Sequence, residues 1–169
     1  MTYRITFKNH LSALKTTFFC TILFFGVGYF VYNKEGFGIN TDTVPYFLIY
    51  YVVSIIPALF LHVEYYLINR KDIVIINALK ETISFNDQKV VYFKNIVKIT
   101  LVMSPVLYRK GSLGFTPFDN YHYAIIMMNG GEEFIFTCLL AKKVEETMKQ
   151  ITDVPIEKRR RFIPSTLMR

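Results

Sequence analysis

The stretch TTFFCTILFFGVGYFVYN, residues 16–33, lies between Lys15 and Lys34 and contains no charged residue. A second stretch, TVPYFLIYYVVSIIPALFLHV, residues 43–63, lies between Asp42 and Glu64 and is also free of Asp, Glu, Lys and Arg. A helix that crosses a hydrocarbon layer of roughly 30 Å needs about 20 mostly apolar residues. The two stretches therefore predict a transmembrane hairpin of two helices over residues 16–67, preceded by an N-terminal segment, residues 1–15.

These stretches have two other interpretations. Both could be buried helices of a soluble core, but such helices usually keep a polar stripe, and neither stretch has one. The first could be a cleaved signal peptide, but Gly26 and Gly28 are followed at once by bulky Tyr29 and Phe30, which does not fit a small-residue cleavage site. A signal peptide would also leave the second stretch unexplained. The membrane hairpin is the favoured interpretation.

Basic residues flank the inner ends of both predicted helices. Arg4, Lys8 and Lys15 precede the first helix without any acid, and Arg70 and Lys71 follow the second. Positive residues close to the ends of membrane spans remain on the cytoplasmic side. The sequence predicts a multi-pass protein of the cell membrane with cytoplasmic N- and C-termini.

From residue 68 to residue 153 the composition is typical of an antiparallel sheet followed by one helix. The β-rich runs cover residues 73–76, 82–85, 90–93, 96–103, 121–128 and 134–139. Asn129, Gly130 and Gly131 predict a tight hairpin turn between the last two runs. Residues 141–151 predict an amphipathic helix, and the segment 104–120 is either a site or holds an extra strand. The predicted fold class is an α+β membrane protein.

The runs FKNIVKI (residues 93–99), YHYAII (121–126), NGG (129–131) and FIFT (134–137) carry a family resemblance. Together with the predicted hairpin and helix, they resemble the bacterial pleckstrin-homology-like (PH-like) membrane proteins over roughly residues 72–151. The resemblance implies a partly open β-barrel of about seven strands capped by the helix, and it identifies no activity. Eukaryotic relatives bind phosphoinositide phosphates through a basic cluster at the first hairpin. Here that region reads NALKE (77–81), with one lysine beside an acid, so this ligand is not supported.

The positive charge is concentrated near the two ends of the chain. The net charge is +7, whereas residues 69–157 are nearly neutral. Residues 154–169 are interpreted as a basic tail, in which Lys158, Arg159, Arg160 and Arg161 either contact anionic lipid or are simply solvated. Nucleic acid is not expected as a partner, because the basic run is short and adjoins a membrane domain.

No catalytic motif is found in the sequence. A glycine-rich phosphate loop, HExxH and GxSxG are all missing. His10, His62 and His122 lie in different segments, as do Cys20 and Cys138, so no metal site, cofactor or disulfide is predicted.

One polar-aromatic group is a candidate interaction cluster. It consists of Asp119, Tyr121, His122 and Tyr123. Because neighbouring residues of a strand point to opposite faces, these side chains are not expected to converge on one point.

Two classes of function are compatible with these features. The favoured one is a non-enzymatic, membrane-anchored PH-like module that docks a protein partner or lipid headgroups at the inner membrane surface. The alternative is a small membrane enzyme or a transporter accessory subunit that uses His62 and Glu64, or the cluster Asp119–Tyr123. The missing acid–base and metal motifs favour the first class.

Overall fold

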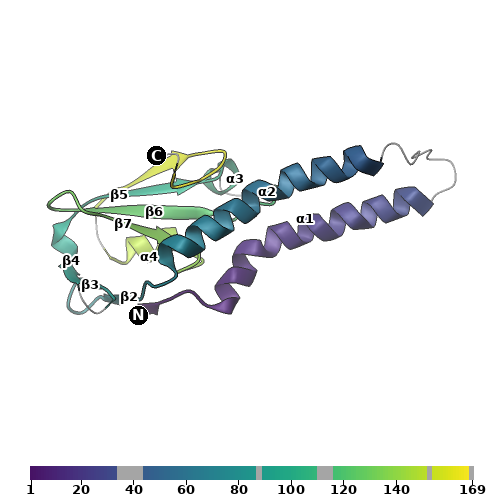
Figure 1. Ribbon diagram of the computed structural model, residues 1–169. Helices are drawn as coiled ribbons and strands as arrows, with labels where there is room; N and C mark the ends of the chain where they lie inside the picture. Colours follow the sequence, from purple (N-terminus) through teal and green to yellow (C-terminus); the bar gives the residue numbers. More distant parts are fainter. Residues whose placement is uncertain (34–43, 87–88, 110–115, 152–153, 168–169) are drawn as a thin grey trace.

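The chain consists of two long helices that project from one side of a sheet domain (Figure 1). The computed structural model describes residues 1–33, 44–86, 89–109, 116–151 and 154–167. Helix α1 covers Phe7–Asn33 and helix α2 covers Val44–Asn69. The two run antiparallel, and Thr21 Oγ1 lies 2.9 Å from the hydroxyl of Tyr51 across their interface.

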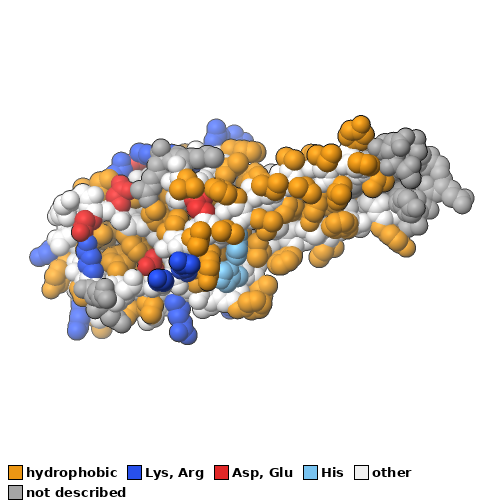
Figure 2. Space-filling view, in the orientation of Figure 1, with side chains coloured by type: hydrophobic (Ala, Val, Ile, Leu, Met, Phe, Trp, Pro, Cys, Tyr) orange, Lys and Arg blue, Asp and Glu red, His pale blue; other side chains and the backbone are white. Residues whose placement is uncertain are grey.

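Most side chains of the hairpin are not covered by protein. In the most apolar window of each helix only 11% and 12% of the residues are buried. Figure 2 shows hydrophobic side chains on all visible sides of the projecting helices. A core helix of a soluble protein would be mostly buried, so the exposure argues against that interpretation.

The domain contains two four-stranded sheets among the described residues. The first has the order β1 (Thr2–Tyr3), β2 (Val74–Asn77), β3 (Thr82–Phe85), β4 (Lys89–Tyr92). The second has the order β7 (Glu133–Thr137), β6 (His122–Met128), β5 (Ile96–Met103), β8 (Ile156–Arg160). All neighbouring strands pair antiparallel except β5 and β8, which are parallel.

The expected barrel is not closed. β4 and β5 follow one another through a 3₁₀ turn, Phe93–Asn95, but they belong to different sheets. The prediction of one antiparallel sheet therefore needs two corrections: the strands form two sheets, and β8 adds a parallel pair. β8 lies beyond α4, and the intervening crossover allows it to enter in the direction of β5.

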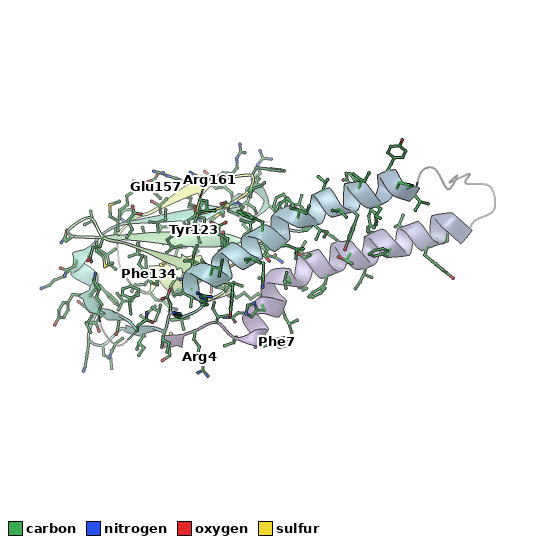
Figure 3. The ribbon with its side chains drawn as sticks, in the orientation of Figure 1. Arg4, Phe7, Tyr123, Phe134, Glu157 and Arg161 are labelled. Atoms are coloured by element: carbon green, nitrogen blue, oxygen red, sulfur yellow. The ribbon has the colours of Figure 1, made fainter. Side chains whose placement is uncertain are left out.

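The first strand belongs to the domain although it precedes the hairpin. Tyr3 pairs with Val74, and the N-terminal amine donates a hydrogen bond to the carbonyl of Ile76 at 2.6 Å. Helix α1 begins at Phe7, close to the base of the domain, whereas the Arg4 side chain points away from it (Figure 3). Strand β1 and the start of α1 thus both lie within residues 1–15, which the sequence predicts as an N-terminal segment ahead of the hairpin. The hairpin is inserted between two paired strands.

The basic C-terminal segment also differs from the expected tail. Residues 156–160 form the edge strand β8, with Glu157 and Arg161 lying along this edge in Figure 3. The charged sequence IEKRR lacks the apolar alternation that indicates a strand, and pairing with β5 decides its conformation.

Two short helices complete the domain. α3 covers Pro105–Tyr108, and its N-cap Ser104 accepts a hydrogen bond from the amide of Leu107. α4 covers Val144–Lys149, which is shorter than the expected 141–151. Its expected apolar positions Val144 and Met148 are buried, as is Ile151 beyond its end. In the segment 104–120, Leu113 lies outside the described residues, and Phe118 is buried.

The predicted turn between β6 and β7 is confirmed. Gly130 has φ +101° and Gly131 has φ +82°, values that side chains with a Cβ rarely adopt. No heavy atom lies within 4 Å of the Cβ that a substitution would add at either position, so the backbone alone limits the choice of residue.

We expect Gly131→Val to lower the free energy of unfolding by about 1 kcal/mol or more, because a β-branched residue is strained at this φ. Thermal unfolding of the full chain in detergent measures the loss. Gly131→Asn is the matched control and should cost less, since Asn tolerates the left-handed region. Equal melting temperatures for Gly131→Val and the parent would contradict the assigned turn.

Candidate functional site: the hairpin–domain junction

The hairpin–domain junction is defined by α1 residues 9–17, α2 residues 58–69 and the domain segments that they contact. Its first component is a chain of hydrogen bonds centred on His62. His62 Nε2 lies 2.9 Å from His10 Nδ1 on α1, and His62 Nδ1 lies 2.9 Å from the Tyr121 hydroxyl. Burial raises the pKa of Tyr121 well above its usual value, so its hydroxyl keeps a proton to donate. The chain connects both helices to the domain.

The second component is the C-terminal strap, residues 162–167, which crosses α2. Glu64 Oε1 accepts hydrogen bonds from the amide of Thr166 at 2.6 Å, from its hydroxyl, and from the amide of Leu167 at 3.1 Å. Glu64 itself is buried. Charge-assisted hydrogen bonds of this kind are about twice as strong as neutral ones. The carboxylate therefore fixes the end of the chain on the helix.

Two tyrosines extend the contact with the strap. The Tyr65 hydroxyl donates to the carbonyl of Pro164 at 2.6 Å, and the Tyr123 hydroxyl donates to the carbonyl of Ser165 at 3.2 Å. The Tyr65 ring packs edge-on against Tyr121 and Tyr123, with centroids 5.6 and 5.8 Å apart. Such pairs contribute about 0.5–1.5 kcal/mol beyond the buried area.

Asparagine and threonine side chains form the third component. Asn9 Nδ2 on α1 donates to the carbonyls of Leu139 and Leu140 at 2.7 and 3.1 Å. On the same helix, Thr17 Oγ1 donates to the carbonyl of Pro117 at 2.9 Å. Asn69 on α2 donates to the carbonyl of Ile135 and accepts from the amide of Thr137. Both helices are thus bonded to domain backbone at several points.

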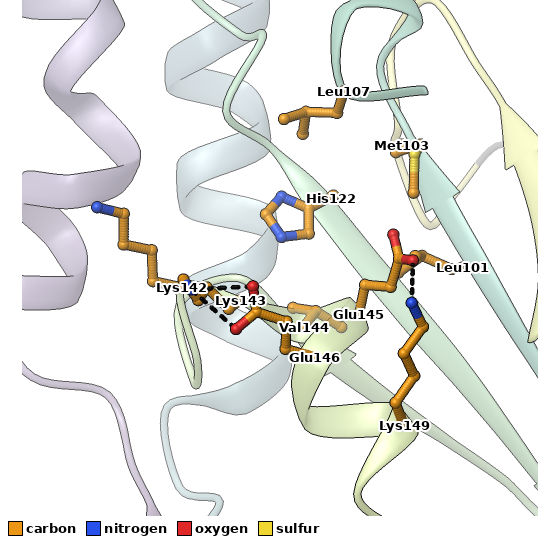
Figure 4. Close-up of a pocket in the computed structure, with 10 residues that line it drawn as sticks. All are labelled: Leu101, Met103, Leu107, His122, Lys142, Lys143, Val144, Glu145, Glu146 and Lys149. Carbon is orange, nitrogen blue, oxygen red and sulfur yellow. Dashed lines mark hydrogen bonds and ion pairs between the residues drawn. The ribbon is translucent and has the colours of Figure 1, made fainter. Parts of the chain in front are cut away.

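The structure separates the predicted cluster Asp119, Tyr121, His122 and Tyr123 into three environments. Asp119 is buried and accepts a hydrogen bond from the amide of Thr116 within its own turn. Tyr121 and Tyr123 face α2, as described above. His122 lines a cavity of about 310 Å³ beside α4 (Figure 4). The expectation that the four side chains do not converge agrees with these positions.

His122 is hydrogen-bonded to the domain backbone. Its Nδ1 lies 2.9 Å from the carbonyl oxygen of Asn120. Burial lowers its pKa, although hydrogen bonds to the backbone of Asn120 and Lys142 oppose the shift. No group of three or more His, Cys, Asp or Glu side chains suited to a metal is present among the residues described.

Two of the four residues predicted to contact lipid are engaged in ion pairs. Lys158 lies 2.8 Å from Glu145, and Arg159 lies 2.7 Å from Glu157. Partial burial of Glu145 opposes the shift, but hydrogen bonds from Lys158 and Lys149 lower its pKa to about 2. Hydrogen bonds from Arg159 and Lys98 lower the pKa of Glu157 to about 2 as well. These acids neutralise part of the positive charge of the segment.

Sequence reasoning missed the contact between His10 and His62, because the two residues are far apart in the chain. The sequence nevertheless contained an indication of this contact. In an antiparallel hairpin, residues at similar distances from the loop face each other, and these histidines lie near the inner ends of their helices. The role of Glu64 carried no comparable signal, since its partners are in the last residues of the chain.

We expect Glu64→Ala to release the C-terminal strap, because up to three donors lose their acceptor, and a buried donor left unsatisfied costs about 1–3 kcal/mol. Hydrogen–deuterium exchange should then accelerate at Thr166 and Leu167 while strand β6 remains protected. Tyr65→Phe should have a smaller effect of the same kind. Tyr66→Phe is the matched control. Unchanged exchange in Glu64→Ala would contradict the contact.

Comparison with known proteins assigns the chain to a family. A family model described as a PH domain matches residues 2–149. No curated protein matches the chain. No solved structure matches it either. The matched region begins at strand β1 and includes both helices of the hairpin, in agreement with the insertion of the hairpin between β1 and β2. The chain belongs to the PH domain family.

Proposed function

We propose that this protein is an interaction module of the cell membrane, in which α1 and α2 span the bilayer and hold the PH domain at its inner surface. The observation that carries the proposal is the exposed apolar surface of two helices that are firmly bonded to the domain at one end only. Exposing such a surface to water costs a free energy of roughly 25 cal/mol per Å² of apolar area. A lipid bilayer removes this cost. PH domains are typically interaction modules for proteins or lipids.

The sheet pairing supports placing both ends of the hairpin on one side of the membrane. Strand β1 enters α1 and strand β2 follows α2, and the two strands are hydrogen-bonded neighbours. Arg4 and Lys8 lie near this end of α1, and Arg70 and Lys71 follow α2. Since positive residues favour the cytoplasmic side, we propose that the N-terminus, the domain and the C-terminus all face the cytoplasm.

The junction supports docking rather than chemistry. His62, Glu64, Asp119, Tyr121 and Tyr123 are engaged in contacts that hold helices, strap and turn together. The enzyme or transporter alternative needs these same side chains for a reaction or a transported ion. We therefore propose a non-enzymatic module whose domain keeps a fixed position relative to the membrane, where it docks a protein partner or lipid headgroups.

The four basic residues 158–161 remain a proposed lipid contact, but ion pairs with acids of the domain weaken the expected attraction of two of them to lipid. Lys158 and Arg159 are paired with acids of the domain, whereas Arg160 is exposed on the edge strand. A basic residue near an anionic membrane contributes about 1 kcal/mol. We expect the paired residues to contribute less than this, because the neighbouring acid is repelled by the same surface.

The membrane topology is tested by cysteine labelling of intact cells with an impermeant maleimide, in a Cys20→Ala background. Gly38→Cys, in the segment between the helices and outside the described residues, should be labelled. Leu79→Cys, at an almost fully exposed domain position, should be labelled only after permeabilisation. Burial raises the pKa of Cys138 to about 12, so its protonated thiol adds little background.

Two outcomes would contradict the proposal. Labelling of Leu79→Cys in intact cells would place the domain outside. Release of the parent protein from membranes by alkaline carbonate would show that the hairpin is not embedded in the bilayer.

A further inference from the structure

We propose that the cavity between α1 and the PH domain binds the phosphate of an anionic phospholipid headgroup. This inference rests on the proposed membrane anchoring and specifies the lipid contact. The cavity has a volume of about 230 Å³. It is lined by Ser12, Ala13, Lys15, Leu107, Asn120, His122, Cys138 and Lys142.

The lining of this cavity is positively charged. Among the described residues the lining contains two lysines and no acid, and Lys15 comes from the helix whereas Lys142 comes from the domain. Figure 4 shows the Lys142 side chain extending toward α1. Among the described residues, neither lysine forms an ion pair. Both side chains line the same space, so an anion in it would be attracted by two positive charges.

The neighbouring cavity beside α4 provides an internal comparison. It shares Leu107, His122 and Lys142 with the first, but its other lysines already have acidic partners. Lys143 pairs with Glu146 at 2.8 Å, and Lys149 pairs with Glu145 at 2.9 Å. An anion entering that cavity would meet two carboxylates. The cavity at α1 is therefore the better anion site of the two.

The remaining polar groups fit a phosphate. The Ser12 hydroxyl can donate one hydrogen bond, and the two lysines can donate charge-assisted bonds to phosphate oxygens. The ring of His122 forms one wall of the cavity, and its Nδ1 is hydrogen-bonded to the carbonyl of Asn120. Asn120 Nδ2 is bound to Thr16 Oγ1 at 2.6 Å, which fixes the opposite side of the opening to α1.

The position on α1 favours a lipid as the source of the phosphate. Thr17 on α1 donates a hydrogen bond to the carbonyl of Pro117, and the next two residues, Phe18 and Phe19, are 51% and 57% exposed. A ligand held by Lys15 would lie where the proposed apolar span begins, which is the level of lipid headgroups. A choline headgroup would bring its own positive charge to two lysines, so an anionic headgroup is preferred.

The test is native mass spectrometry of the full-length chain in detergent, with dioleoyl-phosphatidylglycerol or dioleoyl-phosphatidylcholine added. We expect the parent to retain one phosphatidylglycerol. The double variant Lys15→Gln, Lys142→Gln should lose at least tenfold in occupancy, since each lysine near a lipid phosphate contributes about fivefold. The matched double variant Lys8→Gln, Lys143→Gln removes the same charge from the same two segments but not from the cavity. It should stay within twofold of the parent.

Three outcomes would overturn the inference. Equal losses in both double variants would mean attraction by general surface charge. Equal retention of phosphatidylcholine would remove the preference for an anionic headgroup, and displacement of the lipid by millimolar inorganic phosphate would identify a soluble anion as the ligand. Carbonate extraction of the Lys15→Gln, Lys142→Gln variant separates this test from the proposed function, because the variant should stay in the membrane whether or not the cavity binds lipid.

Discussion

The pairing of β1 with β2 is the constraint on which the rest of the structure depends. Tyr3 lies opposite Val74, although the whole helical hairpin separates them in the chain. The hairpin must therefore leave and re-enter the domain at adjacent points, and its helices must run antiparallel. This geometry brings His10 next to His62 and places His62 within hydrogen-bond distance of Tyr121. The domain is joined to its helices by a sheet and by side chains, and not by a flexible linker.

Polar groups make the junction specific in a way that apolar packing would not. Ala13, Ala58, Leu61 and Tyr65 on the two helices are buried, but apolar contacts tolerate small shifts. Asn9, Glu64 and Asn69 form hydrogen bonds with individual backbone groups, and these bonds depend on distance and direction more strictly than apolar contacts do. A buried polar group without its partner is costly, so a displaced helix would lose several bonds at once. The junction thus fixes one arrangement of hairpin and domain.

A fixed arrangement has consequences for the proposed role as an interaction module at a membrane. With both helices bonded to the domain backbone, the same domain surface would face the lipid in every molecule. Charged groups then have defined positions relative to the helices, as Lys15 and Lys142 have at their cavity. The ion pairs Lys158–Glu145 and Lys143–Glu146 hold other basic side chains on the domain surface. Position as well as total charge decides which basic residues remain available to a ligand.

The sequence by itself determined α1, α2, α4, six of the strands and the turn at Gly130 and Gly131, since these follow from local apolar patterns and from backbone sterics. It did not indicate the short helix α3, which lies where a site or an extra strand was expected. Only the tertiary structure decided the roles of β1 and β8. β1 has only two residues, too few to show a strand pattern, and the sequence IEKRR of β8 has a composition that is unusual for a strand. Each strand therefore depends on pairing with a partner distant in the chain. The same holds for His10 with His62 and for Glu64 with Thr166. Local interactions specify the elements, whereas contacts between distant residues depend on how the elements are assembled.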